Sequence, residues 1–102
     1  MNLDLVKKHL RIDAAHDDDL IQVYIDTSTE FVASYLDKVI YDDQAAFDAA
    51  EATSSDGVIR NNKIDVAIMQ LVGHLYEFRE MLDGTAYELC DQLLITDRKV
   101  VL

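Results

Sequence analysis

Apolar side chains recur at helical spacing over much of the chain, and residues 63–82 carry the strongest pattern. Asn62 can cap the start of a helix there, and Gly84 can take the left-handed conformation that ends one. We therefore predict one uninterrupted helix over 63–82. Its main apolar stripe follows the i, i+3, i+4, i+7 rule and consists of Ile64, Ala67, Ile68, Leu71, Val72, Leu75, Phe78 and Leu82.

A second set of apolar or small residues lies on nearly the opposite side of this predicted helix. It consists of Val66, Met69, Gly73 and Tyr76. A helix that is apolar on two sides is normally covered on two sides. We predict that a neighbouring subunit supplies the second cover, and the alternative is that the first or last helix of the same chain covers these residues.

Arg79 lies within the main apolar arc near the predicted helix end. One interpretation is that its aliphatic stem lies on apolar surface while the guanidinium reaches the last carbonyl groups or Asp83. The other is an ion pair with an acidic residue of a neighbouring subunit. On the second interpretation, Arg79 joins the predicted subunit contact.

Residues 17–39 predict a second long helix, which is apolar on one side only. Asp17, Asp18 and Asp19 form its first turn, where negative charge suits the helix dipole. We predict an antiparallel pair in which the two long helices bury their main stripes against each other. The apolar arc of this helix consists of Leu20, Ile21, Tyr24, Ile25, Ser28, Phe31, Val32, Tyr35, Leu36 and Val39.

The remaining chain predicts shorter helices at 3–10, 43–52 and 86–94, a mobile loop at 53–61 and a flexible tail at 96–102. The fold class is all-α, with one domain over 1–102. The connection between the long helices exceeds the usual length, and such connections often bind partners. We therefore predict partner docking through the large or apolar side chains there and in the tail, which are Phe47, Val100, Val101 and Leu102.

Composition limits the classes of function. The chain has 20 acidic and 9 basic residues, a net charge of −11, which opposes binding to nucleic-acid phosphates. Cys90 is the only cysteine, so no intramolecular disulfide forms, and it is interpreted as a small buried hydrophobic residue. No apolar run approaches the ~20 residues of a membrane span. We expect a cytosolic protein that does not bind membranes.

The sequence predicts no catalytic, cofactor or metal site. His9, His16 and His74 fall in three segments without the spacing of zinc ligands. The acidic run at Asp17–Asp19 lacks the alternating ligands, glycine and terminal glutamate of a calcium loop. The chain is therefore predicted not to be an enzyme.

Two blocks of sequence resemble the phage head–tail connector proteins, also called DNA-packaging or head-completion proteins. The first is Leu3-Asp4-Leu5-Val6-Lys7-Lys8-His9-Leu10-Arg11-Ile12-Asp13, followed by the acidic run, Leu20-Ile21, Tyr24-Ile25 and Glu30-Phe31-Val32. The second is the helix from Ile64 to Glu80, with its His74-Leu75-Tyr76-Glu77-Phe78-Arg79-Glu80 string. Leu75 stands where the family often has tryptophan, and Phe78 where it often has asparagine.

The resemblance implies a structural subunit of a homo-oligomeric ring, commonly a dodecamer, at the virion head–tail junction. It implies that the ring joins the portal protein to the next connector or tail protein, and that DNA passes through it without sequence-specific binding. Assembly would take place in the bacterial host cytoplasm. An acidic lining would let DNA slide through. The alternative from another class is an acidic helical adaptor that binds a basic protein.

Overall fold

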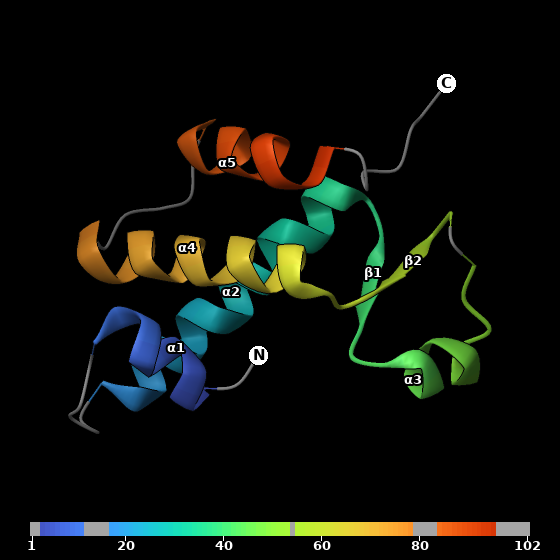
Figure 1. Cartoon of the computed structure of the whole chain (residues 1–102), viewed down its shortest axis with the longest axis horizontal. Coiled ribbons are helices and arrows are strands. Elements are labelled where there is room, and N and C mark those ends of the chain that lie inside the picture. Colours follow the sequence, from blue (N-terminus) through green and yellow to red (C-terminus); the bar gives the residue numbers. More distant parts are fainter. Residues whose placement is uncertain (1–2, 12–16, 54, 79–83, 96–102) are drawn as a thin grey trace.

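The structure is a computed structural model that describes residues 3–11, 17–53, 55–78 and 84–95, and its fold is mostly helical (Figure 1). The all-α prediction is confirmed as the class of the fold, although a small two-stranded sheet was not predicted. The elements in chain order are α1 (Leu3–Leu10), α2 (Asp18–Leu36), β1 (Val39–Tyr41), α3 (Gln44–Ala49), β2 (Gly57–Ile59), α4 (Asn62–Phe78) and α5 (Gly84–Leu94).

Helices α2 and α4 form the centre of the fold and contact each other more extensively than any other two elements. In Figure 1, α5 lies along one side of α4 and α1 along the other, while α2 passes behind. All four helices contribute side chains with no exposed surface, such as Val6, Ile21, Ile68 and Leu94. Full burial of one such side chain stabilises the fold by roughly 1.5–3 kcal/mol.

Two helix boundaries differ from the prediction. Asn61 caps α4, because its side-chain oxygen accepts a hydrogen bond from the Ile64 N–H group at 3.0 Å, and Asn62 is already the first helical residue. Gly84 is the first residue of α5 and does not take the predicted left-handed conformation. The predicted continuation of α4 to residue 82 falls outside the described residues.

Helix α2 ends at Leu36 and not near residue 39, because Asp37 takes the left-handed conformation with φ 54°. The chain then enters β1, which pairs in parallel with β2 in the register Val39–Gly57, Ile40–Val58 and Tyr41–Ile59. Backbone pairing with a distant strand therefore replaces the last helical turn. Part of the segment predicted as a loop at 53–61 is strand β2.

Helix α3 links the two strands and lies within the predicted range 43–52. The Asp43 carboxylate caps it by accepting a backbone N–H group of the first turn at 2.8 Å. The strands and α3 meet closely at Gly57, where an added Cβ would lie 2.8 Å from Tyr41 Cε2 and 3.3 Å from Phe47 Cε2. This approach explains why a glycine occupies the start of β2.

Candidate subunit interface

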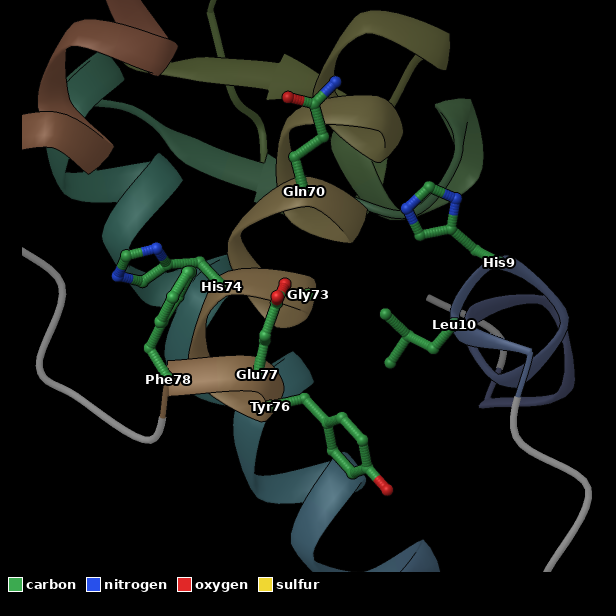
Figure 2. Close-up of a pocket in the computed structure, with 8 residues that line it drawn as sticks. All are labelled: His9, Leu10, Gln70, Gly73, His74, Tyr76, Glu77 and Phe78. Carbon is green, nitrogen blue, oxygen red and sulfur yellow. The ribbon is translucent and has the colours of Figure 1, made fainter.

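A groove of about 780 Å³ separates α1 from the later turns of α4. Figure 2 shows His9 and Leu10 on the α1 wall, facing residues that project from α4. Two residues of the predicted subunit contact, Gly73 and Tyr76, belong to its lining. The full lining is His9, Leu10, Gln70, Gly73, His74, Tyr76, Glu77 and Phe78.

Within the monomer, α1 and the start of α2 cover part of the predicted contact. A Cβ added at Gly73 would lie 3.4 Å from Leu10 Cδ2, so the α4 backbone runs close beside α1. The Tyr76 hydroxyl donates a hydrogen bond to the Asp17 carboxylate at 2.9 Å. These contacts correspond to the alternative in which a helix of the same chain covers this side of α4.

The rest of the predicted contact is divided between packed and exposed residues. Met69 packs against the buried core, whereas Val66 is 37% exposed. Arg79 lies outside the described residues. Val66 is therefore the member of the set whose side chain is open to a neighbour, and the subunit contact itself stays a prediction.

Of the residues predicted to dock a partner, only Phe47 lies within the described residues. Phe47 is half-buried and packs edge-on against Tyr41, with the ring centroids 5.6 Å apart and the planes at 81°. Its ring therefore belongs to the small unit formed by α3 and the strands. The other predicted docking residues, Val100, Val101 and Leu102, lie outside the described residues. Docking through Phe47 stays a prediction.

Several large apolar side chains on the surface were not anticipated as contact residues. Phe78, predicted in the main stripe of α4, is 56% exposed, and its ring centroid lies 5.0 Å from that of His74. Leu5 on α1 and Val23 on α2 are 47% and 57% exposed. Exposed apolar side chains that gather with others often mark contact sites. The available signal in the sequence was the position of Val23 outside the apolar arc of its helix.

Polar contacts hold the helices that carry these surfaces. Lys7 of α1 forms an ion pair with Asp18 of α2 at 2.7 Å, and the Lys7 side chain is only 15% exposed. The Tyr35 hydroxyl of α2 donates a hydrogen bond to the Asp91 carboxylate of α5. An ion pair that is partly shielded from water is screened less by salt than an exposed one. The outer faces of α1 and α2 therefore have a defined relative position.

No catalytic arrangement is found in the part of the chain that the structure describes. Cys90 is buried, and burial together with the neighbouring Asp91 charge raises the pKa of its thiol to about 11, so the reactive thiolate is suppressed at neutral pH. Within the described ranges, no group of three or more His, Cys, Asp or Glu side chains could hold a metal ion. No helix there is long and apolar enough to cross a membrane.

The comparison with protein families identifies a phage structural protein. The family model of the phage gp6-like head-tail connector protein matches residues 1–94, which include all seven helices and strands of the structure. Comparisons with curated proteins and with solved structures yield no match. The matched family is a structural one and is associated with other head and tail proteins of the virion. Because the match extends over nearly the whole sequence, this chain belongs to the phage gp6-like head–tail connector family.

Proposed function

We propose that this chain is a subunit of a connector ring at the head–tail junction of a phage or prophage. Copies of the chain form a homo-oligomeric ring that contacts the portal protein on one side and the next connector or tail protein on the other. The observation that carries this proposal is the family match over residues 1–94.

The charge of the chain supports a channel role. The net charge is −11, and acidic side chains such as Asp48, Glu51 and Glu88 are exposed on the surface of the subunit. Like charge between a ring lumen and DNA phosphates lowers non-specific affinity, which depends mainly on phosphate contacts. A ring of such subunits would allow DNA to move through it without holding the DNA.

The described surface supports assembly. Exposed apolar side chains lie on four different helices, with Leu5 on α1, Val23 on α2, Val66 and Phe78 on α4, and Tyr87 on α5. A subunit in a ring needs two contact surfaces that point in different directions, because each copy has two neighbours. Exposed apolar side chains on several helices can contribute to both contact surfaces.

Co-expression with the portal protein encoded in the same genome tests this function. We expect the two proteins to purify together, and electron microscopy of the complex to show a ring of this chain stacked coaxially on the portal. Portal expressed without the chain is the matched control and should lack this density. A portal that never retains the chain would contradict the proposal, and a salt-sensitive one-to-one complex with a basic protein would favour the adaptor.

A further inference from the structure

Charge is divided unevenly between α1 and α2. Although the whole chain carries a net charge of −11, residues 3–11 contain three basic side chains and one acidic side chain. Helix α2 contains four acidic side chains and no basic one. Lys7 is committed to its ion pair with Asp18, so Lys8 and Arg11 remain as exposed cations of this segment.

The outer side of α1 combines these cations with an apolar residue. Leu5 is 47% exposed, and Lys8 and His9 follow it by three and four residues, which places all three on one side of the helix. Arg11 is exposed directly after the helix ends. We call this set, Leu5, Lys8, His9 and Arg11, the basic face. On the opposite side of α1, Val6 is completely buried.

The outer side of α2 also combines an exposed apolar residue with charged residues, but the charges are negative. Asp19, Val23, Asp26 and Glu30 are separated by four, three and four residues, so they follow one side of the helix over about 17 Å. All four are exposed, and Val23 is 57% exposed. We call this set the acidic face. The α2 residues that pack on α4 lie on the other side of the helix.

Among the described residues, no ion pair joins the basic face to the acidic face of the same copy. Helix α1 packs its buried side against α2 and α4, so Leu5 and Lys8 lie on its outer side, while His9 lies at the edge of the groove toward α4. The acidic face points away from the core on the far side of α2. Neighbouring copies can pair both faces, because the acidic face of one copy can contact the basic face of the next.

Charge also indicates that the partner bound at these two faces is another copy of this chain. Copies with a net charge of −11 repel one another, so a contact between them needs a local group of cations. Among the described residues, the exposed lysine and arginine side chains are Lys8, Arg11 and Lys63, and two of them lie close together in the segment 3–11. The acidic face supplies carboxylates at matching positions around an apolar centre.

We propose that neighbouring copies join head to tail through the basic face of one copy and the acidic face of the next. This inference rests on the proposed function and specifies the surfaces that build the ring. Leu5 and Val23 form the dehydrated centre of the contact, and the surrounding opposite charges set its register and its rate of formation. Since the two faces differ, the contact is heterologous, and such contacts generate rings or open helical assemblies.

Charge reversal tests the pairing. One variant carries Lys8→Glu with Arg11→Glu, and the other carries Asp26→Lys with Glu30→Lys. Sedimentation velocity at low salt and up to ~1 mM protein measures self-association. We expect the wild type to associate, and each variant to associate at least about tenfold more weakly. An equimolar mixture of the two variants should associate again, because both contacts in an alternating assembly then join opposite charges.

A matched control separates local pairing from total charge. Asp48→Lys with Glu88→Lys makes the same change in net charge as Asp26→Lys with Glu30→Lys, at exposed positions on α3 and α5. This control should associate at least as well as the wild type, and circular dichroism should show all variants folded. About 1 M NaCl should weaken wild-type association, because the Debye length falls to about 3 Å.

Several results would overturn the head-to-tail pairing. One is a wild type that stays monomeric at every protein concentration tested, and another is a charge reversal that leaves self-association unchanged. The pairing is also refuted if the mixture of the two variants does not associate, or if the control variant associates as weakly as the reversals. Loss of association in Val66→Asp with no effect of the reversals would assign the contact to α4 instead. The portal co-expression is independent of these results: a portal-bound ring that tolerates both reversals refutes this pairing alone, whereas a portal that never binds the chain refutes the connector function.

Discussion

Replacing Gly73 by alanine should stabilise the monomer, although Gly73 lies in the groove between α1 and α4. Glycine in a helix interior leaves more backbone entropy to be lost on folding than alanine does. The structure shows that a Cβ at this position would lie 3.4 Å from Leu10 Cδ2, which is ordinary van der Waals contact. The added methyl group therefore fits and touches a partner.

The expected magnitude has two parts. The helix propensity difference between glycine and alanine is about 0.8–1.0 kcal/mol. The new methyl group is only partly removed from water by Leu10, so it adds a fraction of the roughly 0.8 kcal/mol of a fully buried methylene. We expect Gly73→Ala to raise the free energy of unfolding by about 1–1.5 kcal/mol, which raises Tm by roughly 4–10 °C for a domain of this size.

Urea unfolding followed by circular dichroism, at concentrations where the chain is monomeric, measures this change. Gly57→Ala is the contrasting control, because its Cβ would lie 2.8 Å from Tyr41 Cε2 and 3.1 Å from Ala52 Cβ. Overpacking of this kind costs about 1–3 kcal/mol. The two glycine substitutions should therefore shift stability in opposite directions.

A neutral or destabilising Gly73→Ala would refute the reasoning, because it would mean that α1 lies closer to α4 than the structure places it. The Leu10→Ala background provides a second test. There the methyl group loses its neighbour, so the gain should fall to the propensity part alone. Equal gains in both backgrounds would show that Leu10 does not contact this position.

Three further predictions concern buried polar groups. Ser28→Ala should change stability by less than about 1 kcal/mol or increase it, because the completely buried hydroxyl has no hydrogen-bond partner among the described residues; a larger loss in urea unfolding would reveal one. Tyr35→Phe should cost about 1.5–3 kcal/mol, because it removes the donor to the partly buried Asp91 carboxylate, and an unchanged unfolding midpoint would contradict this. Stability should fall as pH rises from 9 to 11, because the unfolded thiol of Cys90 ionises near its ordinary pKa of 9.0 while the folded thiol, with a pKa of about 11, keeps its proton. This loss, about 2–3 kcal/mol, should be missing from the pH profile of Cys90→Ala.

Local pattern alone determined most of the helices. The 3.6-residue period of apolar side chains located α1, α2, α4 and α5, because helix formation depends on residues three and four positions apart. It also located most of the buried stripes of the long helices, but Val39 and Phe78, which were predicted in these stripes, are exposed. The same reasoning identified Cys90 as a buried apolar residue. The order of motifs along the first helix and the two long helices also sufficed to indicate the connector family, which the family match confirms.

The sequence alone could not decide which of two neighbouring residues caps or bounds a helix. Asn61 and Asn62 are chemically identical caps, and only the path of the chain into α4 selects Asn61. Gly84 can end one helix or begin another, and the structure uses it at the start of α5. Such boundaries depend on one or two dihedral angles, which the positions of distant elements constrain.

Tertiary structure decided which surfaces remain open. The pairing of β1 with β2 joins segments that are separated by α3, so no local period indicates it. The cover over Gly73 comes from Leu10, and the partner of Tyr76 is Asp17, both far away in sequence. Periodicity shows that a helix has two sides to bury, but the packing of distant helices determines what buries each side. That packing leaves the basic face of α1 and the acidic face of α2 exposed for a neighbour.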